Sequence, residues 1–94
     1  MNRVFQALSD PTRREILRLL RAGDMSAGDL ADRFPLARST LSGHFNVLMQ
    51  AGLIVQERRR TRIIYSVNTS ALEEALAGLM ALMRTRGDGK EASS

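Results

Sequence analysis

Four arginines stand within five consecutive positions of this chain, where they can bind the phosphates of a nucleic acid. They are Arg58, Arg59, Arg60 and Arg62. The planar guanidinium group donates paired hydrogen bonds to phosphate oxygens and to the edge of guanine. The same cluster is also compatible with the solvated tip of a hairpin. A base-reading element beside the cluster favours the phosphate interpretation, and the preceding residues supply a candidate.

The segment ARSTLSGHFNVLMQAGL, residues 37–53, predicts a helix with one apolar face and one small polar face. Its apolar side chains recur at helical spacing, at Leu41, Phe45, Leu48 and Met49. The opposite line consists of Ser39, Gly43, Asn46 and Gln50, flanked by Thr40 and Ser42. Short hydrogen-bonding groups suit a helix that enters the major groove of DNA, which is about 12 Å wide. We expect Ser39, Thr40 and Ser42 to cap the helix start as well as to contact DNA.

Composition excludes several other classes of function. The chain has 94 residues, a formal net charge of +4, no cysteine and one histidine, His44. Disulfides, thiol redox chemistry and cysteine-based zinc sites are therefore excluded. Because the sequence has no cysteine nucleophile, glycine-rich phosphate loop or G-x-S-x-G motif, we do not expect an enzyme. There is no apolar signal core and no apolar run near the ~20 residues of a membrane span, so we expect a cytoplasmic protein without membrane insertion.

The elements that must position these residues begin with four helices. They are predicted at residues 2–8, from Asp10 and Pro11 to Gly23, within 25–34, and at 38–50 with a stop at Gly52. The second helix should bury Ile16, Leu17, Leu19 and Leu20. Its Arg13, Arg14 and Arg18 then look like an ordinary solvated face. In the third helix, Ser26 is the expected cap, Leu30 and Phe34 form the core side, and Pro35 ends the helix.

After Gly52 the hydrophobic period changes. The segments LIVQER and RIIYSVN are rich in β-branched residues, and they predict a β-hairpin with the arginines at its turn. A last helix follows, with Ser70 and Glu73 at the spacing of a capping box. The predicted fold is mostly α with a small β-hairpin: a winged helix-turn-helix with four helices, the hairpin and a final helix. We expect one domain over residues 1–86 and a flexible tail over 87–94.

The last helix also predicts a dimer. Its segment ALAGLMALM is apolar nearly all round, and a terminal helix with two apolar sides usually has two partners. Packing on the core of the same chain is the alternative. We expect the dimer interface to contain Val4, Phe5, Leu8, Leu72, Leu76, Leu79, Met80 and Met83.

Three motifs together resemble one known family. The opening LSDPTRREILRLL, the helix STLSGHFNVLMQAGL and the hairpin exit YSVN look like those of the ArsR-type (arsenical-resistance repressor) winged-helix regulators. The resemblance covers residues 4 to 83, and is strongest to the small cysteine-free autorepressors of that family. It implies a dimeric winged-helix repressor that binds operator DNA and is released by a signal.

The resemblance also implies which residues contact DNA. The base-reading positions match Arg38, Ser39, Ser42 and Gly43, with Thr40 and Asn46 nearby, and the wing contacts match Arg59, Arg60 and Arg62. Two positions depart from the family pattern. Gly43 stands where a longer polar side chain is common, which puts one base contact in doubt. Arg60 stands where glycine is common, so the hairpin turn is expected to be longer or differently bent.

The sensing chemistry of the family does not carry over. Ser26 and Gly28 occupy the positions of the cysteine pair of metal-sensing members. In the last helix, Glu73 and Glu74 are adjacent and point about 100° apart, so they cannot chelate one ion well. We therefore expect no metal and no cofactor, and the sequence leaves a small-molecule or protein effector open.

Two alternatives remain at the level of sequence. His44 is interpreted either as a structural, hydrogen-bonded histidine or as a phosphate contact, and the structural role is favoured. The hypothesis for the whole chain is a dimeric transcriptional repressor, acting for example on its own operon through an inverted-repeat operator. The alternative function is a winged-helix module that binds a protein or RNA partner.

Overall fold

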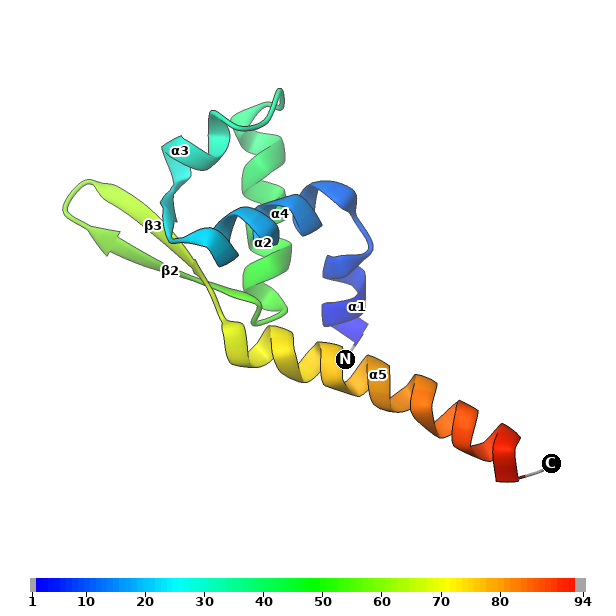
Figure 1. Ribbon diagram of the computed structural model, residues 1–94. Coiled ribbons are helices and arrows are strands. Elements are labelled where there is room, and N and C mark those ends of the chain that lie inside the picture. The colour runs from blue at the N-terminus through cyan, green and yellow to red at the C-terminus, as the bar shows by residue number, and fades with distance from the viewer. Residues whose placement is uncertain (1, 93–94) are drawn as a thin grey trace.

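The computed structural model describes residues 2–92, with side chains described for residues 3–84 (Figure 1). The elements in chain order are α1 Asn2–Leu8, α2 Pro11–Ala22, β1 Met25–Ser26, α3 Ala27–Ala31, α4 Arg38–Gln50, β2 Ile54–Arg59, β3 Arg62–Val67 and α5 Thr69–Ala92. The predicted winged helix-turn-helix is confirmed, with α3 and α4 as its two helices and β2–β3 as the wing.

Helix α2 forms as the sequence predicts. The Asp10 carboxylate accepts a hydrogen bond from the backbone N–H of Arg13 at 3.1 Å, which satisfies a donor of the first turn. All four residues of the expected stripe, residues 16, 17, 19 and 20, are buried. In α1, however, the buried side chain is Ala7, whereas Phe5 is 42% exposed. Small Ala7 fits at the close approach of α1 to α2 and α4.

The interpretation of Arg13 as part of a solvated face is wrong, whereas Arg14 is exposed as expected. Arg13 donates to the carbonyl oxygens of Gln6 and Ala7, each at 2.9 Å, and Arg14 donates to the carbonyl of Leu8 at 2.7 Å. The last carbonyls of a helix lack partners within it, so two arginines of α2 cap the C-terminus of α1.

The sheet has one strand that the sequence pattern does not predict. Strand β1 pairs antiparallel with β3, and the strand order is β1-β3-β2. Residues 25 and 26 were expected to begin a helix, but their backbone pairs with Tyr65 and Ile64 before α3 starts. Two residues are too short to display a hydrophobic period, so only tertiary pairing reveals this strand. Ser26 still caps α3, accepting from the Asp29 N–H at 3.0 Å.

Buried side chains from α2, α3, α4 and the sheet form one core. From the helix-turn-helix and the sheet it takes Leu30, Leu41, Phe45, Leu48, Leu53, Ile54 and Tyr65. Helix α3 ends at Ala31, earlier than expected, and Phe34 is only partly buried against the core. Pro35 follows in the connection to α4.

Asn68, and not Ser70, caps the last helix. Its Oδ1 accepts from the Ala71 N–H at 3.2 Å, while its Nδ2 donates to the Gly52 carbonyl at 3.0 Å. Gly52 adopts a φ of 75°, which a glycine tolerates without a Cβ clash. One asparagine side chain therefore joins the end of α4 to the start of α5.

Helix α5 is longer than predicted and extends away from the rest of the molecule (Figure 1). Its backbone remains helical to Ala92, through most of the segment expected to be a tail, and residues 93–94 lie outside the described part. The inner side of its first turns carries Ala71, Leu72 and Ala75, which are buried or half-buried. The division into a domain at 1–86 and a tail stays a prediction.

Candidate nucleic-acid interface

Helix α4 has the two faces that its sequence predicts. Leu41, Phe45 and Leu48 are buried in the core. The side chains at positions 38, 39, 40, 42, 43, 46 and 50 are all exposed. The candidate base-reading set Arg38, Ser39, Thr40, Ser42, Gly43 and Asn46 therefore lies together on the solvent side of one helix.

The outer face of α4 is not explained by helix capping. The N-cap is Ala37, and no side chain caps this helix start. The expectation that Ser39, Thr40 and Ser42 act as caps is therefore wrong. A Cβ added to Gly43 would meet no atom within 4 Å, so packing within the chain does not require glycine there. The small polar face is left available for a ligand.

An aromatic contact ties α4 to the wing. The ring centroids of Phe45 and Tyr65 lie 4.6 Å apart at an interplanar angle of 37°. Tyr65 sits in the central strand β3 and is 7% exposed; burial raises the pKa of its hydroxyl. Because this aromatic pair is packed in the core, it fixes the position of the wing relative to α4.

The wing turn is short. Arg59 pairs with Arg62, so only Arg60 and Thr61 connect the two strands. Of the two alternatives expected for a turn without glycine, longer or differently bent, the longer turn is wrong. Arg60 itself takes the left-handed conformation, with a φ of 58°, as a two-residue hairpin requires at its first central position.

All four wing arginines are exposed, and two of them have acidic partners. Arg59 Nε lies 2.9 Å from Glu57 Oε1 within the wing. Arg62 Nη2 lies 3.5 Å from Asp29 Oδ2, which belongs to α3. The remaining two, Arg58 and Arg60, form no ion pair among the described side chains.

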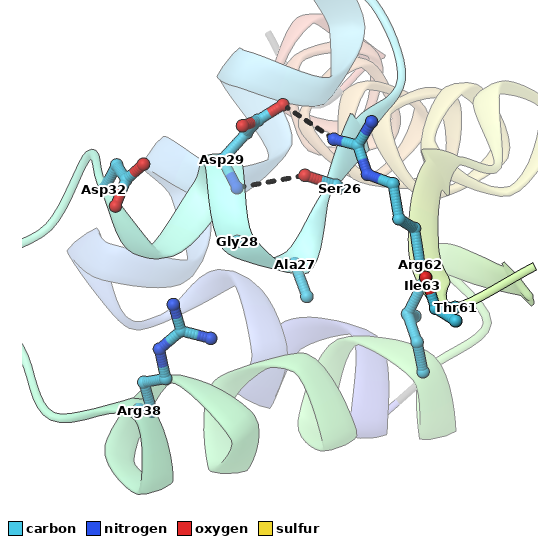
Figure 2. A pocket seen from close by; sticks show the side chains of 9 residues that line it. All are labelled: Ser26, Ala27, Gly28, Asp29, Asp32, Arg38, Thr61, Arg62 and Ile63. Atoms are coloured by element: carbon cyan, nitrogen blue, oxygen red, sulfur yellow. Dashed lines mark hydrogen bonds and ion pairs between the residues drawn. The ribbon is translucent and has the colours of Figure 1, made fainter. Parts of the chain in front are cut away.

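The start of α4, the start of α3 and the wing meet at one cleft of about 400 Å³ (Figure 2). Its polar lining combines both signs of charge. Arg38 lines it from α4, Arg62 from β3, Asp29 from α3, and Asp32 from the position directly after α3 (Figure 2). The cleft thus brings together one predicted base-reading arginine and one predicted wing arginine, which are 24 positions apart in sequence.

His44 occupies a structural position. Its side chain is 17% exposed, and Arg13 Nη1 lies 3.1 Å from its Nδ1. Arginine has no acceptor, so Nδ1 must accept this hydrogen bond. The Asp10 carboxylate is 3.9 Å from the same nitrogen. Arg13 consequently joins α1, α2 and α4, and this contact supports the structural interpretation of His44.

Several side chains of the predicted dimer interface form an apolar surface on α5. Leu76, Leu79, Met80 and Met83 are between 43% and 68% exposed, and the unassigned Leu82 is 66% exposed. Phe5 of α1 is exposed as well, whereas Val4, Leu8 and Leu72 already pack partly against the core of their own chain. Single exposed hydrophobic side chains are normal on a protein surface, but this many on one helix indicate an interaction surface.

Comparisons with known proteins agree on one family. A helix-turn-helix domain family matches residues 8–57. The transcriptional repressor SdpR of Bacillus subtilis is 44% identical over 88 residues, which cover 94% of this chain and 97% of the relative. The ArsR-like transcriptional regulator of Rhodococcus sp. RHA1 superposes with a TM-score of 0.89 at 33% identity, covering 97% of this chain and 84% of the other.

The chain belongs to the ArsR family of winged-helix transcriptional regulators. A further solved relative is the homodimeric winged helix-turn-helix DNA-binding domain Mb0332 of Mycobacterium bovis, a possible ArsR-family regulator. It has a TM-score of 0.71 and 27% identity, covering 92% of this chain and 82% of the other. Membership in an ArsR-type regulator family supports the expectation that the chain is not an enzyme.

Neither a membrane-spanning helix nor a metal-binding cluster occurs among the described residues. No described helix is long and apolar enough to cross a membrane. Nor do three or more His, Asp or Glu side chains gather into a metal-sized cluster in the described part of the chain.

The sequence reasoning missed the pairing of Arg62 with Asp29. Both residues occur in predicted elements, but neither spacing nor charge pattern reveals a contact across 33 positions. It also missed the network of Arg13, for which a signal existed. Arg13 stands in the first turn of α2, directly after the end of another helix, where unpaired carbonyls are available.

Proposed function

We propose that this ArsR-family chain is a dimeric transcriptional repressor that places α4 in the major groove of operator DNA and the β2–β3 wing on the phosphate backbone. The convergence of Arg38 and Arg62 on one cleft carries the proposal. In a helix-turn-helix protein, the N-terminal residues of the recognition helix contact base edges. Arg38, Ser39 and Ser42 occupy that end of α4.

The character of the exposed side chains supports separate roles for the two elements. Hydroxyl, amide and guanidinium groups on α4 can hydrogen-bond to base edges, and Gly43 lets the helix backbone approach the groove closely. The wing arginines Arg59, Arg60 and Arg62 would contact phosphates or the minor groove, which fixes orientation.

A second copy of the chain would supply the second recognition unit for an inverted-repeat operator. One small recognition unit discriminates poorly among the sites of a genome, so such proteins read inverted repeats as dimers. The exposed apolar surface of α5, together with Phe5, is the proposed interface. The homodimeric Mb0332 domain supports this arrangement.

Selection of genomic fragments by the purified chain tests the proposed function. The bound fragments should share an inverted repeat, and random duplex should compete for binding far less well than the selected duplex. Arg38→Ala should weaken binding to the selected duplex by about 1–3 kcal/mol and binding to random duplex by less. Equal losses would contradict base reading, and capture of RNA or protein without any DNA preference would overturn the function.

A reporter fused to the promoter of the chain's own gene tests the regulatory sign. Expression of the chain should lower reporter output, because a bound dimer occludes the promoter, and Arg38→Ala should restore it. Unchanged output with a promoter that carries the selected repeat would contradict repression.

A further inference from the structure

Arg62, which the proposed function places on DNA, already has a partner in the free protein. Its Nη2 lies 3.5 Å from Oδ2 of Asp29, and the dashed line in Figure 2 marks this contact. The pair joins β3 to α3 across the cleft. Both side chains are about three-fifths exposed, at 62% and 61%. A single long contact between exposed groups is weak and orients the guanidinium little.

Asp32 is the second carboxylate of the cleft and can be compared with Asp29. It lines the same cleft, is exposed, and carries the same charge, but it forms no ion pair with any described side chain. Both carboxylates line the cleft, but of the two only Asp29 contacts Arg62.

We infer that Asp29 limits the affinity of the wing for DNA by competing with phosphate for Arg62. This inference rests on the proposed wing contact. Two effects act in the same direction. The Asp29–Arg62 contact must be given up before Arg62 binds a phosphate. In the complex, the carboxylate then stays within a Debye length of that phosphate, about 8 Å at physiological salt, so the like charges repel.

The geometry of the Asp29–Arg62 contact fits competition for the guanidinium better than a role in holding Arg62 in a DNA-binding orientation. A supporting carboxylate would hold the guanidinium through short, paired hydrogen bonds, as Arg–carboxylate pairs often do. Asp29 makes one contact at the long end of the range. Its backbone N–H, and not its carboxylate, serves the α3 cap, so the side chain can be changed without removing that cap.

A double-mutant cycle on DNA binding tests the inference. Asp29→Asn and Asp32→Asn each remove one negative charge from the cleft, and each is combined with Arg62→Ala. The probes are the duplex selected above and a random duplex of the same length, titrated at several salt concentrations. Asp29→Asn should tighten binding to the selected duplex about two- to fivefold beyond Asp32→Asn. With Arg62→Ala in place, the difference between the two aspartate variants should shrink, because the competition for Arg62 is gone and only the repulsion between Asp29 and the phosphate remains.

The outcomes separate the inference from the function that it rests on. If Arg62→Ala weakens DNA binding but Asp29→Asn behaves like Asp32→Asn, the inference is overturned and the wing contact stands. Weaker binding by Asp29→Asn would make Asp29 a support, which also overturns it. If Arg62→Ala changes neither the affinity nor the salt dependence, the wing contact and the inference both fail.

Discussion

Arg13 fills a gap in the hydrogen bonding of the fold. Its guanidinium supplies donors to two carbonyls at the end of α1 and to His44 on the recognition helix. Arg13→Ala should lower the free energy of unfolding by about 1–3 kcal/mol, because two partly buried acceptors, the Ala7 carbonyl and His44 Nδ1, lose this donor. Chemical denaturation measures this change.

The matched control is Arg18→Ala on the same helix. Arg18 is 68% exposed and pairs with Glu15, so this change should cost at most about 1 kcal/mol. Equal effects of the two substitutions would show that the Arg13 network contributes nothing beyond surface charge.

The lowered pKa of Asp10 predicts that the free energy of unfolding decreases in acid. Burial raises the pKa of its carboxyl, but hydrogen bonds from the backbone N–H groups of Arg13 and Thr12 and the nearby charge of Arg13 lower it, so the net pKa lies below the ordinary 3.8. A carboxyl with a lowered pKa stabilises the fold above its unfolded pKa, and that stabilisation is lost as the pH falls through the folded pKa.

Asp10→Asn tests this coupling, because asparagine is also a good N-cap. As the pH falls below about 4, the unfolding free energy of the variant should decline less steeply than that of the wild type. Parallel declines in denaturant titrations would contradict the assignment.

Single residues show where prediction from sequence ends. The cap at Asp10 and the buried stripe of α2 follow local rules, so they were predictable. The contacts of Arg13 with His44, of Asp29 with Arg62 and of Asn68 with the Gly52 carbonyl span 16 to 33 positions, and no local pattern encodes such partners.

The wing combines a backbone strain with a charged side chain. At φ 58°, Arg60 occupies a conformation that costs a non-glycine residue about 1–2 kcal/mol. Arg60→Gly should therefore raise the free energy of unfolding by about 1 kcal/mol while weakening DNA binding. The slope of log affinity against log salt should flatten by about 0.9 for the lost phosphate contact.

Arg21→Ala is the charge-matched control for Arg60→Gly. Arg21 lies beside the start of α5 and outside the cleft, so this variant should keep the wild-type salt slope. If Arg60→Gly gains stability without any loss of DNA affinity, the arginine at the wing tip does not contact DNA.

Some helices and strands could be predicted from the sequence, and others could not. Helix α4 matches its predicted bounds of 38–50, because its apolar residues recur regularly and Gly52 stops it. The hairpin was predicted from β-branched residues. Strand β1 was not, since its two residues form a strand only by pairing with β3. The turn at Arg60 could not be predicted because an arginine, unlike glycine, rarely adopts a left-handed φ.

The whole molecule is proposed to work as a dimer through α5. Leu79 is 43% exposed in the single chain, so Leu79→Asp should leave the fold of the protomer intact while placing a charge in the interface. Sedimentation at micromolar concentration should give a dimer for the wild type and a monomer for Leu79→Asp. Circular dichroism should show that both are folded.

Val55→Asp controls for a charge on an exposed apolar site. Val55 is 51% exposed in β2 and is not part of the apolar surface of α5, so its variant should remain a dimer. Dimerisation of Leu79→Asp at wild-type strength would exclude this face of α5 as the interface. The apolar character of α5 was predictable from the sequence. Which of its apolar side chains are exposed and which pack against the core could be seen only in the folded chain.

The most direct test of the account is the footprint of the purified chain on its selected duplex. A dimer that reads with two copies of α4 should protect two half-sites related by an inverted repeat, with centres about 10 bp apart or a multiple of that spacing. Titration should show two protomers bound per duplex. A single, non-repeated protected site occupied by one protomer would contradict the account.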